Sequence, residues 1–349
     1  MAATTLMTPT VPLRMAGYRS ETTKQTEEVV RGLMSAQHIE NPARPSRRSS
    51  TRSTIVIASL LGVLTCGLAA LRPVEALAQA PAQIPTQGNE SGSLELVDPN
   101  VFRACGDPRN LPFSNDRSEG FENKLAELFA AKLGKKLSYT YFPQATGFVR
   151  MTLGSYRCDV IMGFPQGDDQ AQATIPYYRT TYALITKRGS GLEDVTAIND
   201  PRLKDKRIGV VAKTPPSTNM AVNGLLAKAK SYPLFIDTRA DSSAQAMIDD
   251  LNQDKIDCGI LWGPMAGYFA AKANPPLVVV PLVKETMGPQ MTYRIGMAVR
   301  AADQEWKRTL NKLITENQTE INKLLISYNI PILDDSNAPI TSDTLSKRP

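Results

Sequence analysis

The same order of strands and helices occurs twice in this chain. In each half, short apolar runs of strand length alternate with stretches that carry apolar residues at helical spacing. In the first half, strands are predicted at 101–105, 137–142 and 159–163, and helices at 120–133 and 148–155. In the second half, strands are predicted at 207–211, 235–237 and 256–261, and helices at 219–230 and 243–252. Such alternation is typical of an α/β fold with parallel strands, so we predict two doubly wound α/β lobes.

Two further extended segments connect the lobes. Residues 182–186 leave the first unit and residues 293–300 follow the second, and we interpret them as paired hinge strands. The second hinge strand returns the chain to the first lobe, where residues 302–328 have the spacing of two helices. The predicted boundaries are 101–186 plus 297–333 for lobe 1, 187–296 for lobe 2 and 334–349 for a polar tail.

The start of the chain has the features of a secretory leader. Arginines precede the apolar run 55–71, and small residues follow where signal peptidase requires them. We predict a leader and signal peptide over 1–78, with cleavage after Ala78, and a flexible linker over 79–100. A transmembrane anchor is the alternative, although the run is at the short end for a span. A start at Met34 would explain the long segment before the arginines.

Removing the predicted leader changes the charge balance. The leader holds nine of the 40 Lys and Arg residues and five of the 34 Asp and Glu residues, so the remainder is nearly neutral. This balance gives no basis for nucleic-acid binding. The single histidine, His38, is also in the leader, which excludes histidine-based nucleophilic catalysis and histidine-ligated metals in the mature chain. The adjacent Asp168 and Asp169 have no accompanying base. We therefore predict no catalytic residue, no metal site, no cofactor and no embedding in the membrane after signal cleavage.

An exported chain with two α/β lobes and two hinge strands resembles the solute-binding proteins of ABC transporters, family 3. This implies a periplasmic-binding-protein-like fold of type II, with ligand between the lobes at the carboxyl ends of strands. Amino-acid binders of that family grip the α-carboxylate with an Arg and the α-ammonium with a second-lobe Asp. Here Gln170 stands in place of the Arg, and in DCGILWGP Trp262 stands in place of the Asp. An amino acid is therefore a poor ligand candidate, because a zwitterion would be desolvated without charge pairing.

Eight blocks follow in order along the mature chain: CGDPRNLPFSN, GFENKLAELFAAKLG, GFVRMTLGSYRCDVIMGFPQG, PYYRTTYALITKR, DPRLKDKRIGV, TPPST, WGPMAGYFA and YRIGMAVR. Together they resemble the MxaJ/XoxJ group of solute-binding-like proteins associated with quinoprotein dehydrogenases. The resemblance implies a periplasmic, non-enzymatic accessory protein that docks with a PQQ-dependent methanol dehydrogenase and supports its maturation or activity. The alternative is an ABC-transporter receptor for a small solute that is not an amino acid.

Residues from both lobes are predicted to line a cleft for a ligand or a partner. Trp262 and Tyr268 would provide an aromatic platform, unless Trp262 only caps the core of its own lobe. Phe113 lies in a proline-containing loop that suits recognition, or else seats this ring against the first helix. Arg150 would face an acidic group, or else solvent. The predicted set is Asp107, Asn110, Phe113, Phe148, Arg150, Phe164, Gln170, Tyr177, Thr214, Thr218, Trp262 and Tyr268.

Three cysteines remain after the leader, and an oxidising compartment permits a disulfide. Cys105 and Cys158 are the best candidate pair, although parallel neighbouring strands would place them several residues out of register. A bridge needs Cα atoms within about 7 Å, so this pair would require a local distortion. Cys258 lies inside an apolar strand and is predicted to be a buried free thiol.

Overall fold

The computed structural model describes residues 95–234, 236 and 241–346. The predicted leader and signal peptide (1–78), its cleavage position, the alternative anchor and residues 79–94 of the predicted linker lie outside the described residues. No helix among the described residues is long and apolar enough to cross a membrane.

The first half of the described chain alternates strands with helices, as predicted. Its elements are β1 (Val101–Gly106), β2 (Arg109–Asn110), β3 (Ser114–Asn115), α2 (Phe121–Lys132), β4 (Lys136–Tyr141), α3 (Phe148–Met151), β5 (Val160–Pro165) and β6 (Gln172–Ala173). The α2 helix begins at Gly120, where the side-chain oxygen of Asn123 accepts a hydrogen bond from the Gly120 amide at 3.1 Å. This bond satisfies one of the amides that a helix start leaves unpaired. The helix buries Phe121, Leu125 and Phe129 in the core of this half.

The second half repeats the alternation and then adds the C-terminal helices. Its elements are β7 (Tyr178–Thr186), η1 (Pro201–Leu203), β8 (Ile208–Val211), α4 (Pro215–Val222), β9 (Lys230–Tyr232), α5 (Ser243–Asn252), β10 (Cys258–Trp262), α6 (Gly263–Lys272), β11 (Val278–Pro281), β12 (Thr292–Val299), α7 (Gln304–Glu316), α8 (Gln318–Ser327) and α9 (Ser342–Ser346).

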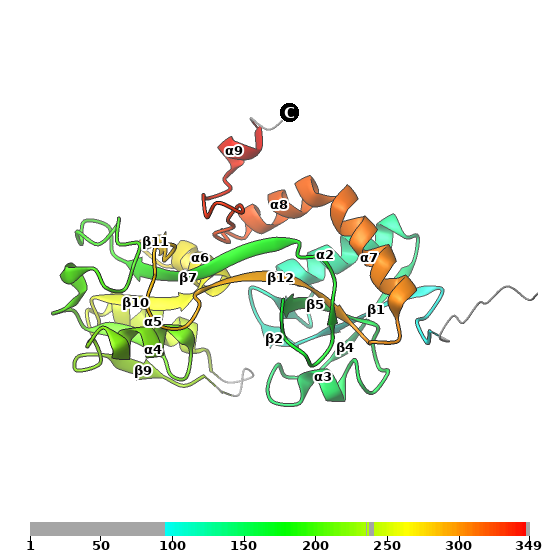
Figure 1. The fold of residues 1–349 in the computed structure, drawn as a ribbon, viewed down its shortest axis with the longest axis horizontal. Helices are drawn as coiled ribbons and strands as arrows, with labels where there is room; N and C mark the ends of the chain where they lie inside the picture. The colour runs from blue at the N-terminus through cyan, green and yellow to red at the C-terminus, as the bar shows by residue number, and fades with distance from the viewer. Residues whose placement is uncertain (1–94, 235, 237–240, 347–349) are drawn as a thin grey trace, which may run out of the picture. The chain divides into compact units, whose positions relative to one another are not determined.

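The strands of both halves join in one ten-stranded sheet with the order β4-β1-β5-β12-β7-β10-β8-β9, in which β11 also pairs with β7 and β6 with β12. Parallel pairs occur on either side, β4-β1-β5 in the first half and β10-β8-β9 in the second. Between them, β7 and β12 run antiparallel, with Thr292 opposite Thr181 and Ile295 opposite Tyr178. Figure 1 shows these two long strands side by side between α2, α7 and α8 on one side and α4, α5 and α6 on the other. They occupy the place predicted for the hinge strands.

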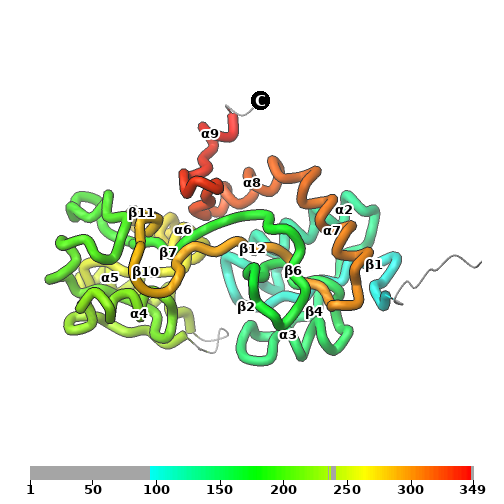
Figure 2. The backbone as a smooth tube through the Cα atoms, in the orientation of Figure 1, coloured from blue at the N-terminus to red at the C-terminus, as the bar shows by residue number. Residues whose placement is uncertain are grey.

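Each half has its own core. The first-half core is formed by β1, β5, β12, α2, α7 and α8, and includes Trp306 and Leu310 of α7. The second half has apolar clusters on both faces of its strands. Figure 2 shows that the chain crosses from one half to the other along β7 and returns along β12. The lobe boundaries themselves stay a prediction.

Three predicted elements of the second half differ from the structure. The helix expected at 219–230 is α4, which begins earlier because Pro215 and Pro216 fit a first helical turn, and ends before Gly224 at φ +69°. The strand that pairs with β8 at the edge of the sheet is β9, and not a strand at 235–237. Residues 235 and 237 lie outside the described residues. No helix is predicted directly after the strand at 256–261, but Gly263 and Pro264 begin the α6 helix, since a proline in the first turn leaves no intrahelical hydrogen bond unmade.

One predicted helix of the first half is also corrected, and hydrogen bonds hold the end of the predicted linker. The helix expected at 148–155 is the shorter α3, which ends at Met151 with Thr152 as its C-cap, and the Thr152 hydroxyl donates to the Phe148 carbonyl at 2.7 Å. The predicted linker is held at its end, because the Glu95 carboxylate accepts the Trp306 amide at 3.1 Å. The Leu96 carbonyl also accepts a hydrogen bond from Arg103 at 3.1 Å.

Candidate functional site

A pocket of about 1290 Å³ opens where the two halves meet. The first half contributes the β2–β3 hairpin, the start of α2 and the end of β5, and the second half contributes the end of β10, α6 and the start of α5. The strands β7 and β12 provide its base. Carboxyl ends of parallel strands therefore meet at this pocket, which is the usual position of a ligand site in α/β proteins.

Three aromatic rings from three neighbouring strands lie together in the pocket. Trp262 on β10 stands opposite Tyr182 on β7 in the sheet, and their ring centroids are 5.1 Å apart in an edge-to-face arrangement. Tyr293 on β12 also contacts the indole edge-to-face, with ring centroids 5.7 Å apart. Trp262 is partly buried and also packs on the core of the first half. This cluster therefore joins the two halves at the hinge strands while leaving indole surface in the pocket.

A second aromatic group lies along α6. Tyr268 stacks with Tyr328, with centroids 6.4 Å apart, and the Lys272 ammonium lies 4.2 Å from the centre of the Tyr268 ring. The Tyr328 hydroxyl donates to the Glu119 carbonyl at 2.7 Å. These contacts connect α6 of the second half with the segments that flank α2 and α8.

The wall of the first half contains a buried carboxyl group, Glu122, at the second position of α2. Its side chain is adjacent to Gly163, where a Cβ would lie only 2.1 Å from Glu122 Oε1. Burial, and secondarily the charge of Asp107, raise the pKa of Glu122 to about 8. At neutral pH this carboxyl group is therefore mainly protonated while no ligand is bound.

The β2–β3 hairpin is held in place by hydrogen bonds from beneath. The Asp107 carboxylate accepts the Arg109 amide at 2.8 Å and the Gln144 amide at 2.6 Å. On the exposed side, the Asn110 side chain donates to the Gln144 side chain at 2.7 Å. The Phe113 ring packs against the Phe121 ring of α2, with ring centroids 5.5 Å apart, and it also lines the pocket. The loop thus both packs on the helix and presents a ring, so the two interpretations of Phe113 are compatible.

Half of the predicted cleft residues line this pocket. They are Asn110, Phe113, Phe164, Thr214, Trp262 and Tyr268. The prediction that Trp262 faces the space between the lobes agrees with its place in the pocket wall.

The other six predicted residues do not line the pocket. Tyr177 is buried in the core, where its hydroxyl donates to the Met162 carbonyl at 2.9 Å, and Phe148 is buried beside the disulfide. Asp107 is buried beneath the hairpin. Arg150, Gln170 and Thr218 are exposed elsewhere. The core positions of Tyr177 and Phe148 show that an aromatic residue near a strand end fills a core as readily as it lines a cleft.

Among the pocket residues that the sequence prediction did not name, Tyr182, Tyr293 and Glu122 matter most for the chemistry of the site. Tyr182 and Tyr293 were assigned only to the hinge strands, and Glu122 was not singled out at all. Glu122 is followed by the polar Asn123 and Lys124, so its residue type gave no indication that it would be buried.

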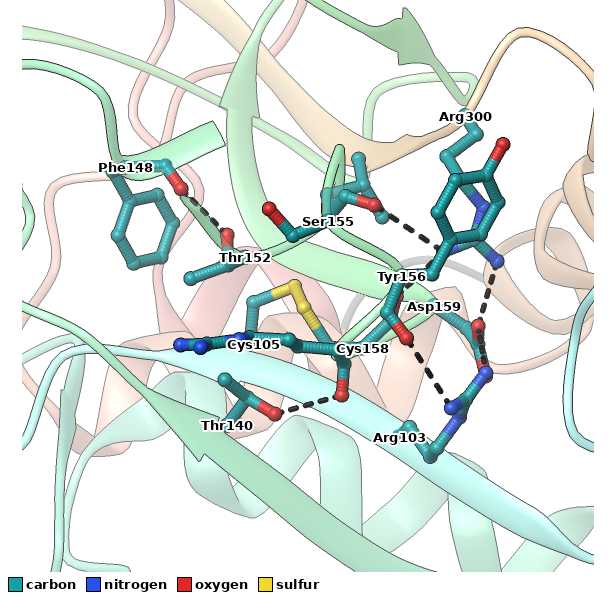
Figure 3. Close-up of a disulfide and its surroundings, with 12 residues drawn as sticks. Arg103, Cys105, Thr140, Phe148, Thr152, Ser155, Tyr156, Cys158, Asp159 and Arg300 are labelled. Carbon is teal, nitrogen blue, oxygen red and sulfur yellow. Dashed lines mark hydrogen bonds and ion pairs between the residues drawn. A yellow bond between two sulfur atoms is a disulfide. The ribbon is translucent and has the colours of Figure 1, made fainter. Parts of the chain in front are cut away.

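The disulfide lies away from the pocket. Cys105 and Cys158 are joined, with Cα atoms 5.5 Å apart, and this is the pair proposed from the sequence. The β1–β5 register places Cys105 opposite Ile161, and the chain turns before β5 so that Cys158 reaches Cys105 (Figure 3). The local distortion expected for this bridge is thus the turn before the strand.

A buried ion-pair network lies beside the disulfide (Figure 3). The fully buried Asp159 pairs with Arg103 at 2.7 Å and with Arg300 at 2.6 Å. Because each carboxylate oxygen has a guanidinium partner, the charge is compensated, and the network acts as structural support.

The remaining chemistry of the described residues is limited. Cys258 is a buried free thiol, and burial raises its pKa to about 12. No group of His, Cys, Asp or Glu in the part of the chain that the structure describes could hold a metal ion. The pocket therefore offers aromatic surface, hydrogen-bonding groups and one buried carboxyl group.

Comparison with known proteins gives consistent results. Residues 122–321 match the family model described as "Bacterial extracellular solute-binding protein". The chain is 26% identical to the protein MoxJ of Methylorubrum extorquens over 286 residues, which cover 77% of this chain and 94% of MoxJ.

Two solved structures are similar over two thirds of this chain. The crystal structure of the periplasmic binding protein XoxJ from Methylobacterium extorquens AM1 matches with 39% identity and a TM-score of 0.58, over 67% of this chain and all of XoxJ. MxaJ from Methlophaga aminisulfidivorans MPT matches with 24% identity and a TM-score of 0.57, over 66% of this chain and all of MxaJ. The predicted α/β fold of type II is confirmed.

Proposed function

This chain belongs to the bacterial extracellular solute-binding protein family and is homologous to MoxJ, MxaJ and XoxJ, and on this premise we propose that it is a periplasmic accessory protein of a PQQ-dependent methanol dehydrogenase. It docks with the dehydrogenase and supports its maturation or activity, without catalysing a reaction itself. The predicted signal peptide would deliver it to the periplasm. The likeness to XoxJ, at 39% identity across the whole of that chain, is the observation that carries the proposal.

The pocket chemistry supports a role other than amino-acid transport. The end of β10 presents the indole of Trp262 where an amino-acid receptor would need a carboxylate for the α-ammonium group. Aromatic side chains of this kind are frequent anchors in protein interfaces, because they bury a large area with few rotatable bonds. The Trp262 cluster and Tyr268 therefore suit a docking surface.

Close packing of α6 also supports docking over ligand-driven closure. A Cβ on Gly267 would lie 1.8 Å from the Asn329 carbonyl oxygen, and one on Gly263 would lie 2.5 Å from the Thr181 carbonyl oxygen. The backbone of α6 is therefore in close contact with the backbone of β7 and with that of the segment after α8. Closure of one half on the other would have to separate or slide these contacts, whereas a docking protein benefits from a fixed surface.

The docking proposal is tested with the exported protein and the purified dehydrogenase. We expect co-purification, and a change in dehydrogenase activity or PQQ occupancy when the protein is added. Tyr268→Ala, in the pocket, should weaken the association, while Tyr156→Ala, an equally large change at an exposed tyrosine outside the pocket, should not. Absence of association together with unchanged activity and occupancy would refute the proposal.

A transport receptor is the second candidate, and the pocket between the halves is the observation that favours it. A receptor is stabilised by its solute, because the solute binds only the folded state. A thermal-shift screen that gives one strong hit among small solutes, without association with the dehydrogenase, would support transport. A flat screen together with co-purification would support docking.

A further inference from the structure

The buried carboxyl group of Glu122 has no polar partner in the pocket wall. Its side chain is only 8% exposed, and within the described residues it makes no hydrogen bond and no ion pair. Buried carboxyl groups are ordinarily paired, because removing one from water without compensation is unfavourable. The other buried acids of the first half follow this rule: Asp159 pairs with two arginines, and Asp107 accepts two backbone amides.

Space is kept for this carboxyl group by a glycine. Gly163, at the pocket end of β5, is adjacent to Glu122, and any side chain there would collide with Glu122 Oε1. Both residues line the pocket. The carboxyl group is therefore placed at the edge of the open space, with room to meet an incoming group.

The charged and titratable groups near Glu122 do not neutralise it. Asp107, after β1, adds negative potential. The hydroxyl groups of Tyr139 on β4, of Tyr177 just before β7 and of Tyr178 on β7 are neutral neighbours whose pKa values are raised mainly by burial. The pocket wall also contains arginines and a lysine. Arg117 pairs with Glu119 at 3.1 Å and Lys272 lies on the Tyr268 ring, and no basic residue in the described part of the chain forms an ion pair with the Glu122 carboxyl group.

Aromatic rings provide the rest of the wall next to this carboxyl group. Tyr178 is close enough to Glu122 to interact with its charge. Tyr182 follows Tyr178 by four residues on β7, and Tyr293 is two residues from Ile295, which is opposite Tyr178 on β12. These two rings and Trp262 line the same pocket as Tyr178 and Glu122. Faces of such rings attract cations, and most strongly where water is displaced. A neutral solute would leave the carboxyl group unpaired, and an anion would be repelled by it.

We propose that Glu122 and the Trp262, Tyr182 and Tyr293 rings form a binding site for a small organic cation. The ammonium group of the ligand pairs with the Glu122 carboxylate, and its alkyl or aryl part lies on the rings. This site goes beyond the docking role, because it is a property of the isolated protein and does not require the dehydrogenase.

Binding of a cation is coupled to loss of the Glu122 proton. Since burial raises the pKa of Glu122 to about 8, the empty site is mainly protonated at pH 7 and the occupied site is ionised. The affinity for a permanent cation should therefore increase by roughly tenfold for each pH unit between 6 and 8, and level off above pH 8. Calorimetry at pH 7 should detect proton release as a difference in binding heat between two buffers of different ionisation enthalpy.

The probe is benzyltrimethylammonium, whose charge does not depend on pH, with benzyl alcohol and benzoate as neutral and anionic comparators. The variant is Glu122→Gln, which keeps the shape and removes the charge. The matched control is Glu127→Gln on the same helix, where the carboxylate is exposed and pairs with Lys124 at 3.0 Å. Circular dichroism verifies the fold of both variants.

We expect saturable binding of the cation, weakened at least tenfold by Glu122→Gln at pH 8.5 and unchanged by Glu127→Gln. The pH dependence should be absent in Glu122→Gln. The proposal is overturned by lack of binding at millimolar cation, by equal binding of the neutral or anionic comparator, or by equal affinity of Glu122→Gln and wild type. If the cation does not bind but the complex with the dehydrogenase forms, only the cation site is refuted. If the cation binds but no complex forms, only the docking role is refuted.

Discussion

Trp262 and Tyr182 stand directly opposite each other in adjacent strands, with their rings in edge-to-face contact at 5.1 Å. Trp262 ends β10 of the second half, and Tyr182 lies on β7, the strand that leads into that half. Because Tyr293 of the returning strand contacts the same indole, all three segments at the junction of the two halves are joined through one side chain.

Trp262→Ala should destabilise the protein because it removes contacts with both halves. For a partly buried indole we expect a loss of about 2–4 kcal/mol in the free energy of unfolding, and a smaller loss for Trp262→Phe, which keeps a ring. Urea unfolding followed by circular dichroism measures both values. Equal stability of the alanine variant and wild type would show that the indole does not contribute to the junction.

Glu122→Gln should become more stable than wild type as the pH rises. The folded-state pKa of Glu122, about 8, is above its unfolded value near 4.3. Between these two pKa values the folded state holds the Glu122 proton more tightly than the unfolded state does. The contribution of this group to wild-type stability is therefore fully present below about pH 4 and is lost as the pH rises toward 8. The advantage of Glu122→Gln should grow by at most ~1.4 kcal/mol per pH unit in this window. Unfolding titrations at pH 4.5, 7 and 9 test this.

For this stability series, Glu127→Gln is again the control, since its carboxylate is exposed on the same helix. Its difference from wild type should change little with pH. A stability difference for Glu122→Gln that is also independent of pH would contradict the shifted pKa.

Gly163→Ala should destabilise the protein through contact with Glu122. The added Cβ would lie 2.1 Å from Glu122 Oε1, so the carboxyl group must move out of its place. We expect a loss of about 1–3 kcal/mol, as for overpacked positions. In a Glu122→Ala background most of this loss should disappear, because the colliding atom is gone. A double-mutant cycle by urea unfolding measures this coupling, and strictly additive effects would argue against the contact.

Replacing the disulfide with Cys105→Ser and Cys158→Ser should lower stability markedly. The bridge closes a loop with a sequence separation of 53, which corresponds to about 3–5 kcal/mol in chain-entropy terms. Thiol titration of the unfolded wild type should detect one free thiol in the described chain, that of Cys258. Cys258→Ser alters a buried thiol without touching the bridge, and by comparison should have a smaller effect. Equal stability of the double serine variant and wild type would exclude a stabilising bridge.

Local patterns were sufficient for the elements whose apolar residues recur regularly. The spacing of Phe121, Leu125 and Phe129 predicted α2 almost to its ends, because that spacing places them on one face that must be buried. The same reasoning predicted β5 and the C-terminal helices. It failed at α6, because Gly263 and Pro264 are typical both of a break and of a helix start, and only the residues around them decide between the two.

The sequence by itself determined the α/β class, the two halves and the aromatic residue at the end of β10, because these depend on periodicity and on residue type. Only the tertiary structure decided which of the candidate residues line the pocket, because that depends on how strands distant in sequence are paired. Tyr177 and Tyr178 are adjacent and their rings are in contact, with centroids 4.9 Å apart, yet only Tyr178 lines the pocket, because the Tyr177 hydroxyl donates to the Met162 carbonyl inside the core. The protonation of Glu122 was likewise decided by tertiary structure, because burial against Gly163, and not residue type, raises its pKa.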